Sequence, residues 1–212
     1  MSNTRNAKIL YMVELAMLSA LIVVLQFVGS FLTGVTGLPM SLVLIPIVVG
    51  AFHLDPKAGA FLGGVFGLMT VIMGFSGADL FTNILFNQFG TTKMIICVAL
   101  CFIKAIAAGL GAGLIYKGLV KLFKGKNVTV ATILASVSAP VINTGLFVAA
   151  MLLFFFNDMG AIQTQLGIAT ITPSFKFIFL GLAGWNFISE FIINLVVSPA
   201  VARLVDVFKK RK

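Results

Sequence analysis

Long apolar runs dominate this chain and restrict it to a membrane-spanning fold. Mean hydropathy is +1.14, 60% of the residues are hydrophobic and only 10% are charged, which lies outside the range of soluble domains. A helix needs about 20 apolar residues to cross a bilayer, so 212 residues, loops included, allow about six crossings. The first run, residues 10–32, is longer than the apolar region of a signal peptide and lacks a clear cleavage site, so we expect it to be retained.

Breaks in the hydropathy divide the chain into six expected transmembrane helices. They lie near residues 9–31, 39–53, 57–74, 93–121, 129–156 and 176–206. Together they would form one integral membrane domain, 1–212, with no sizeable domain outside the bilayer. We therefore expect an all-α, multi-pass protein of the cell membrane.

The net charge of +9 is distributed unevenly between the two expected sides of the membrane. If both termini lie on one side, that side receives most of the 15 basic residues, and only Lys93 and Lys176 flank the other side. The positive-inside rule then makes both termini and the loop 117–127 cytoplasmic. The charge thus indicates topology rather than nucleic-acid binding. The residues on the expected cytoplasmic side are Arg5, Lys8, Lys57, Lys117, Lys121, Lys124, Lys126, Arg203, Lys209, Lys210, Arg211 and Lys212.

Lys104 is a charged residue in the middle of an expected membrane helix. Every residue between it and Lys93, and between it and Lys117, is uncharged. On a helix that begins near Lys93, the rise per residue places Lys104 roughly 16 Å deep, near mid-bilayer. A charge there costs at least ~2.5–3.5 kcal/mol on insertion scales, and such residues usually face a cavity, a partner charge or a permeating solute. Lys104 therefore indicates that the chain holds something polar, and by its sign anionic, within the membrane.

Other polar residues are expected at the same depth as Lys104. Asn143 would lie roughly 21 Å above the inner surface, and Asn186 and Glu190 about 15 Å and 21 Å below the outer one. Asn186, Glu190 and Asn194 follow the spacing i, i+4, i+8 and so share one face of the last helix. Trp185, the only Trp of the chain, is next to Asn186 and could be a stacking wall.

The same residues also have a purely structural interpretation. Lys104 and Glu190 would then neutralise each other as an ion pair. Asn143 and Asn194 would join helices through hydrogen bonds, and Trp185 would face lipid. Pairing of the two charges does not exclude contact with a ligand, because a pocket can use both.

The two long segments on the expected outer side, 75–92 and 157–174, are polar and contain aromatic residues. Segments of this length without regular structure are often lids or binding loops. Asn83, Asn87 and Gln88 belong to the first of them.

Signatures of an enzyme are missing from the sequence. The segment 74–77, GFSG, is not the G-x-S-x-G nucleophile elbow, and no Walker A motif is present. His53 is the single histidine, so a metal cluster is not expected. Cys97 and Cys101, one helical turn apart in an apolar run, are interpreted as small packing residues. We expect neither catalysis nor a cofactor.

Three segments together resemble a known family. They are 37–51 (GLPMSLVLIPIVVGA), 54–60 (LDPKAGA) and 63–67 (GGVFG). In this order they look like the substrate-binding S component of energy-coupling factor (ECF) vitamin transporters. The spacing Ala16-x-x-x-Ala20 is similar to that family's docking motif for its transmembrane coupling subunit. The resemblance extends over the whole chain in size and six-helix layout, and is clearest in 14–70.

The resemblance implies a high-affinity vitamin binder that supplies no energy itself. A coupling subunit would dock at Ala16 and Ala20, and two cytoplasmic ATPases would act indirectly through that subunit. The family's ligand lies near the outer face, under loops that correspond here to Thr36, Gly37 and Leu38 and to Asn83–Gln88. The pocket would then draw on Lys104, Asn143, Trp185, Asn186 and Glu190.

The vitamin is predicted from two observations. The stretch around Ile45-Pro46 and Gly50-Ala51 most resembles the pantothenate branch, and a mid-membrane lysine suits a small carboxylate. Riboflavin, folate and a thiamin precursor remain alternatives within the family. Two other classes stay open as well: a stand-alone secondary transporter driven by protons through Glu190, and a membrane scaffold that binds no solute.

Overall fold

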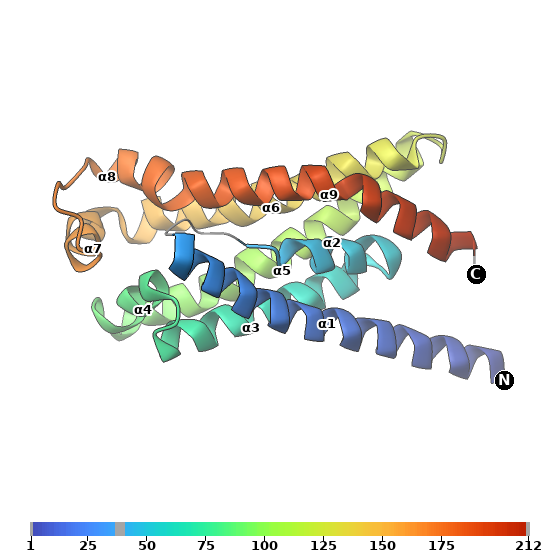
Figure 1. Cartoon of the computed structure of the whole chain (residues 1–212), viewed down its shortest axis with the longest axis horizontal. Helices are drawn as coiled ribbons and strands as arrows, with labels where there is room; N and C mark the ends of the chain where they lie inside the picture. The colour runs from blue at the N-terminus through green and yellow to red at the C-terminus, as the bar shows by residue number, and fades with distance from the viewer. Residues whose placement is uncertain (1, 37–40, 211–212) are drawn as a thin grey trace.

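The computed structural model describes residues 2–36 and 41–210, and every regular element in these ranges is helical (Figure 1). The long helices run side by side along the molecule, and its two ends carry the short elements and the termini. The elements are α1 (Ser2–Thr36), α2 (Leu44–His53), α3 (Pro56–Ser76), α4 (Leu80–Asn87), α5 (Gly90–Leu122), α6 (Val128–Phe154), η1 (Phe156–Asp158), α7 (Met159–Gln165), α8 (Ser174–Lys176), η2 (Phe177–Gly184) and α9 (Trp185–Lys210).

Five helical segments of the described chain are long and apolar enough to cross a membrane: Arg5–Leu32, Pro56–Ser76, Gly90–Leu122, Val128–Phe154 and Ser174–Val205. The prediction of a sixth full crossing at 39–53 needs correction. Helix α2 has ten residues, which at 1.5 Å per residue reach only about half the ~30 Å hydrocarbon core. It leads the chain back toward the end where α3 begins, so α1 starts and α9 finishes at the same end of the bundle (Figure 1).

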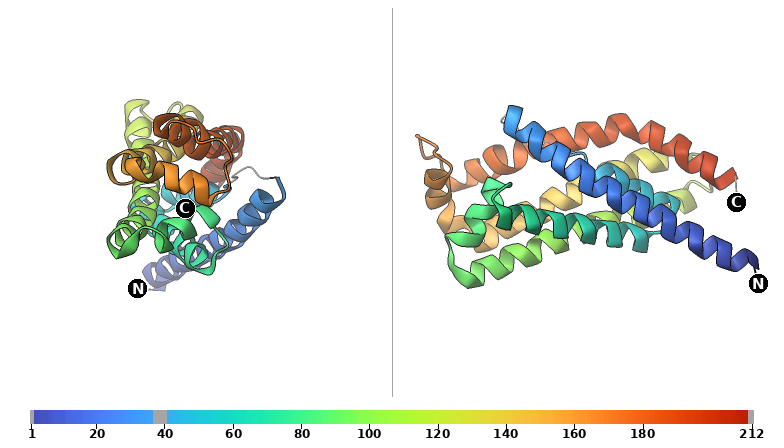
Figure 2. Two further views of the ribbon diagram at one scale, coloured as in Figure 1. Left: turned by 90° about the vertical axis from the view of Figure 1, so that its left-hand side faces the viewer. Right: turned by 60° about the horizontal axis from the view of Figure 1, so that its bottom comes forward.

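Both segments that were expected to be outer loops are folded. Residues 80–87 form α4, whose first turn is capped by Asp79: its carboxylate accepts hydrogen bonds from Thr82 N at 3.2 Å and Thr82 Oγ1 at 2.6 Å. The second segment forms η1 and α7, held by the fully buried side chain of Gln163, whose amide bonds to the backbone N–H and C=O of Thr172 at 2.8 Å and 3.0 Å. These elements lie at the end of the bundle away from the termini (Figure 2).

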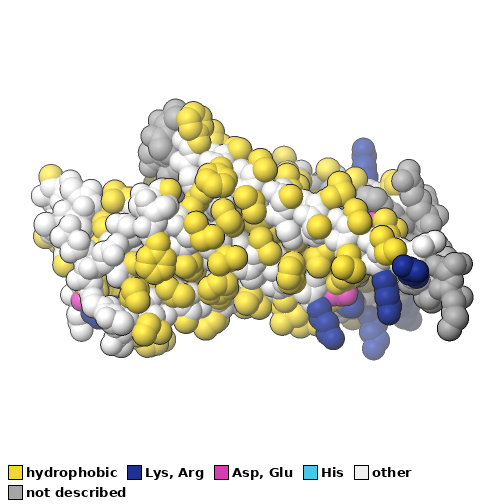
Figure 3. Space-filling view, turned by 90° about the horizontal axis from the view of Figure 1, so that it is seen from below, with side chains coloured by type: hydrophobic (Ala, Val, Ile, Leu, Met, Phe, Trp, Pro, Cys, Tyr) yellow, Lys and Arg dark blue, Asp and Glu magenta, His cyan; other side chains and the backbone are white. Residues whose placement is uncertain are grey.

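The outer surface is apolar over the middle of the molecule (Figure 3). On the face shown, most Lys and Arg side chains gather at the end that carries the termini. Such an apolar band between polar ends is the surface of a protein whose middle lies in hydrocarbon.

Helices α3 and α5 approach each other so closely that their contact consists partly of backbone. A Cβ atom on Gly63 would lie 2.2 Å from the carbonyl oxygen of Ala105, and one on Gly109 would lie 2.1 Å from that of Gly59. Glycine is needed at these positions because no side chain fits. The contact fixes α5, which carries Lys104, against its neighbour.

Helix α1 is attached less extensively than the other long helices: only 11% of its most apolar window is buried. Near the end with the termini, Glu14 lies 3.2 Å from Nε2 of His53, and the hydroxyl of Tyr11 donates to Asp55 at 3.3 Å. These contacts join α1 to the turn between α2 and α3. The opposite side of α1 remains exposed.

We expect Gly63→Ala to destabilise the protein by about 1–3 kcal/mol, because the new methyl group overlaps backbone of α5. Thermal unfolding of the purified chain should show a midpoint lowered by several degrees. Gly64→Ala is the matched control, since the nearest atom to its added Cβ is Ile106 Cγ1 at 3.9 Å. Equal midpoints for the two variants would contradict the close α3–α5 contact.

Candidate ligand-binding site

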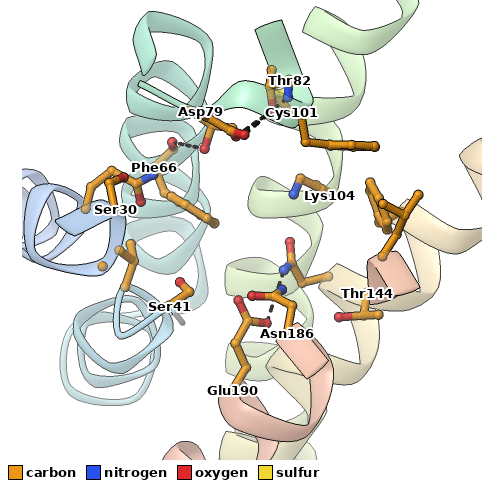
Figure 4. A pocket seen from close by; sticks show the side chains of 18 of the residues that line it. Ser30, Ser41, Phe66, Asp79, Thr82, Cys101, Lys104, Thr144, Asn186 and Glu190 are labelled. Atoms are coloured by element: carbon orange, nitrogen blue, oxygen red, sulfur yellow. Dashed lines mark hydrogen bonds between the residues drawn. The ribbon is translucent and has the colours of Figure 1, made fainter. Parts of the chain in front are cut away.

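A cavity of about 590 Å³ lies among the helices. Its walls come from α1, α3, α5, α6, η2 and α9, with residues around 41–43, 78–82 and Leu166 completing it. The volume falls in the ~300–1,000 Å³ range of small-molecule sites, and the wall is mostly apolar with a few polar groups, as such sites usually are. Figure 4 shows the polar side chains pointing into this space.

Lys104 points into the cavity from α5 (Figure 4). Its ammonium nitrogen lies 5.6 Å from the ring centre of Phe147 and 6.0 Å from that of Phe66, within reach of cation–π attraction. In the described part of the chain the ion pairs are Glu14–His53 and Lys93–Asp158, so Lys104 has no carboxylate within 4.0 Å. The proposed ion pair with Glu190 is therefore not formed.

Glu190 faces the same cavity from α9 and is almost fully buried, with 1% of its surface exposed. Asn143 on α6 donates to Glu190 Oε2 at 3.4 Å, and Asn186 lies one turn before Glu190 on the same helix. Asn194, one turn further, donates to the backbone carbonyl of Glu190 at 2.8 Å. The cavity thus contains a positive and a negative group that do not touch each other, and a second carboxylate, that of Asp79, lines it as well while it accepts hydrogen bonds from Thr82.

Three further buried polar atoms belong to residues that line the cavity and have no partner. Within the described residues, Ser41 Oγ, Asn143 Oδ1 and Thr144 Oγ1 make no hydrogen bond. A buried polar group left unpaired typically costs ~1–3 kcal/mol. A solute in the cavity that offers N–H or O–H groups can satisfy these atoms.

The chain matches the family described as "ECF transporter, substrate-specific component" over residues 10–202. This match covers nearly the whole sequence. The chain belongs to this family of transporter subunits. It is accordingly a multi-pass membrane protein and a component of a transporter rather than an enzyme. A search of curated proteins finds no significant match.

Four of the five residues predicted for the pocket of this S component line one cavity: Lys104, Asn143, Asn186 and Glu190. Trp185 does not. It is 56% exposed and lies on the outside of the bundle, because it precedes Asn186 by one residue and so points about 100° away around the helix. The aromatic part of the wall comes instead from Phe66, Phe81 and Phe147, and Trp185 is left out of the site.

The predicted lid residues Asn83, Asn87 and Gln88 do not line the cavity. Asn83 turns toward α3 and donates to Gly74 O at 2.8 Å, while Asn87 and Gln88 are exposed. The residues of this segment that reach the cavity are the earlier ones, 78–82, because the first turn of α4 faces it. Thr36 is the last residue of α1, and Gly37 and Leu38 lie outside the described residues.

Several lining residues were not identified from the sequence. Among them are Ser30, Ser41, Thr70 and Thr144, which are short hydroxyl residues that also occur as packing residues in membrane helices. The π-helix η2 contributes residues 181–183 to the wall. π-Helical turns are rare and frequent at functional sites, but sequence patterns do not reveal them.

Ala16 and Ala20 lie one turn apart on the exposed side of α1. Their large neighbours Met12 and Met17 are both 67% exposed. This side is turned away from the contacts with His53 and Asp55, so a partner could reach it without displacing α1.

We expect Phe147→Leu to weaken substrate binding roughly 2- to 30-fold, the range set by loss of ~0.5–2 kcal/mol of cation–π attraction that positions Lys104. Trp185→Leu is the matched aromatic control and should leave the dissociation constant within about twofold. Calorimetric titration of both variants measures this. A larger loss of affinity for Trp185→Leu than for Phe147→Leu would contradict the conclusion that Phe147, and not Trp185, lines the cavity.

Proposed function

We propose that this S component binds an acidic vitamin, first of all pantothenate, in the cavity around Lys104 and presents it for import. The observation that carries the proposal is the Lys104 ammonium, which faces the cavity without a carboxylate partner among the described residues. A ligand carboxylate there would form a charge-assisted hydrogen bond in a medium of low dielectric constant.

The rest of the cavity favours a ligand that also carries hydrogen-bond donors. The Glu190 carboxylate, Asn143 Oδ1 and Thr144 Oγ1 are buried acceptors that border the cavity. Pantothenate has a carboxylate at one end, an amide N–H a few bonds away and two hydroxyl groups at the other end. The arrangement of opposite charges at one depth suits such a molecule.

The other vitamins are less well supported. A neutral ring system such as riboflavin would leave Lys104 unpaired, and the exposed Trp185 cannot stack on it within the cavity. A thiamin precursor would use Glu190 but again leave Lys104 without a partner. Folate, which carries carboxylates, is the second candidate. Membership of the family argues against the two alternatives of another class, a stand-alone proton-driven transporter and a scaffold that binds no solute.

The partner surface is proposed on α1. Both ends of the chain lie at the basic end of the bundle, which we place in the cytoplasm by the positive-inside rule. Ala16 and Ala20 then form the contact with a coupling subunit, and two cytoplasmic ATPases act through that subunit. Small residues at this place let another helix approach closely.

Calorimetric titration of the purified chain against pantothenate, folate, riboflavin and thiamin precursors tests the proposal. Pantothenate should bind with the highest affinity. Lys104→Met should weaken pantothenate binding roughly 10- to 150-fold, because loss of a hydrogen bond to a charged group costs about 1.5–3 kcal/mol.

The control for this prediction is a change in the ligand rather than in the protein. The neutral alcohol analogue of pantothenate, with CH₂OH in place of the carboxylate, should lose far less affinity on Lys104→Met than pantothenate does. An equal loss for both ligands would show that Lys104 does not hold the carboxylate. Thermal unfolding of the variant establishes that it is folded.

We expect the double variant Ala16→Trp, Ala20→Trp to abolish assembly with the coupling subunit and uptake, because indole rings keep the partner helix away. Pantothenate binding should stay within about twofold, since neither residue lines the cavity. Ala149→Trp, an exposed alanine on α6, is the matched control and should assemble normally. Normal uptake by the double variant would exclude this docking surface.

A further inference from the structure

We propose that Cys97 and Cys101 form a dithiol site on the cavity wall that takes thiophilic arsenic(III) compounds, and that occupation of this site excludes the vitamin. Both cysteines line the cavity from α5, although each is at most 4% exposed. The solvent-sized space that both cysteines border is this cavity.

The spacing of Cys97 and Cys101 suits a single atom that bonds to both sulfurs. Residues i and i+4 lie on one side of a helix with Cβ atoms ≈ 5–6 Å apart, so the thiols of Cys97 and Cys101 lie on the same side of α5, one turn apart. A disulfide requires Cβ atoms ≈ 3.5–4.5 Å apart, so direct oxidation of this pair would distort α5. A single atom inserted between the two sulfurs relieves that mismatch.

Arsenic(III) supplies such an atom. With an organoarsenic(III) oxide, each thiol forms one As–S bond, the As=O bond breaks, and the oxygen leaves as water with both thiol protons. Arsenic stays in oxidation state III, so no oxidant or reductant is needed. Nothing in the described part of the chain joins these cysteines in a group of three His, Cys, Asp or Glu that could hold a metal ion. A ligand that needs only two sulfurs therefore fits best.

The position of the site couples it to the vitamin. Cys97, Cys101 and Lys104 follow the spacing i, i+4, i+7, so the three side chains share one face of α5. An arsenic atom bridging the two sulfurs, with its organic substituent directed into the cavity, occupies space next to the Lys104 ammonium. A carboxylate could then no longer reach that group.

The test uses phenylarsine oxide and intact-protein mass spectrometry of the full-length chain in detergent. The folded wild type should gain one adduct per chain, and the adduct should be released by 2,3-dimercaptopropanol. Cys97→Ala and Cys101→Ala should each lose the stable adduct, because a single As–S bond hydrolyses. An adduct that forms only after unfolding in dodecyl sulfate, or that persists in both single variants, would overturn the proposal.

A second arm adds pantothenate and so rests on the proposed function. Saturating pantothenate should slow adduct formation at least tenfold, and the adduct should abolish pantothenate binding. If pantothenate binds but leaves the rate of adduct formation unchanged, the dithiol is not part of the cavity and the inference is wrong. If the adduct forms as expected but pantothenate does not bind at all, the dithiol site stands and the vitamin assignment fails.

Discussion

An ammonium group in the middle of a membrane helix has to be compensated, and the structure around Lys104 provides only part of that compensation. Two phenylalanine rings face the cation, at 5.6 Å and 6.0 Å from their centres. Cation–π attraction is worth about 0.5–2 kcal/mol per ring, but the rings supply no conventional hydrogen-bond acceptor for the three N–H groups of the ammonium. The remainder has to come from water or from a solute in the cavity. A binding site for an anion follows from this shortfall.

The bundle is built so that this cation stays in place. Glycines on α3 let the backbone of α5 approach to contact distance, which fixes the helix that carries Lys104. On the opposite wall, Glu190 is held through its side chain by Asn143 and through its backbone by Asn194. The two charges therefore face one cavity without collapsing onto each other. A solute with a carboxylate and neighbouring donors can bridge them.

Helical rise predicted similar depths for Lys104, Asn143, Asn186 and Glu190, because depth in a straight helix depends only on residue count, and the structure has all four residues lining one cavity. The direction in which a side chain points around the helix axis was harder to predict. Trp185 was placed in the pocket because it is next to Asn186, yet one step along a helix turns a side chain by about 100°. The π-helix that precedes Trp185 also changes the phase of the preceding segment, and no sequence pattern indicates it.

Local features of three segments explain the other differences between the predicted and the observed structure. The run 39–53 is mostly apolar, but the helix within its described part, Leu44–His53, has ten residues and is too short to cross the bilayer, although it returns the chain to the end where α3 begins. The polar segment 75–92 was expected to be a loop, whereas the caps from Asp79 stabilise α4 within it. Cys97 and Cys101 were interpreted as packing residues because they lie one turn apart in an apolar run and the chain has a single histidine. An apolar helix shows no preferred face until its neighbours are known. Their place on the cavity wall appeared only in three dimensions.

The most direct test of the account is mass spectrometry of the small molecule that co-purifies with the chain. We expect a carboxylic acid with N–H or O–H donors a few bonds from the carboxylate, and pantothenate in the first place. We also expect this acid to be lost from the Lys104→Met protein. A neutral or cationic molecule, or an acid retained equally by the variant, would contradict the claim that Lys104 holds the substrate.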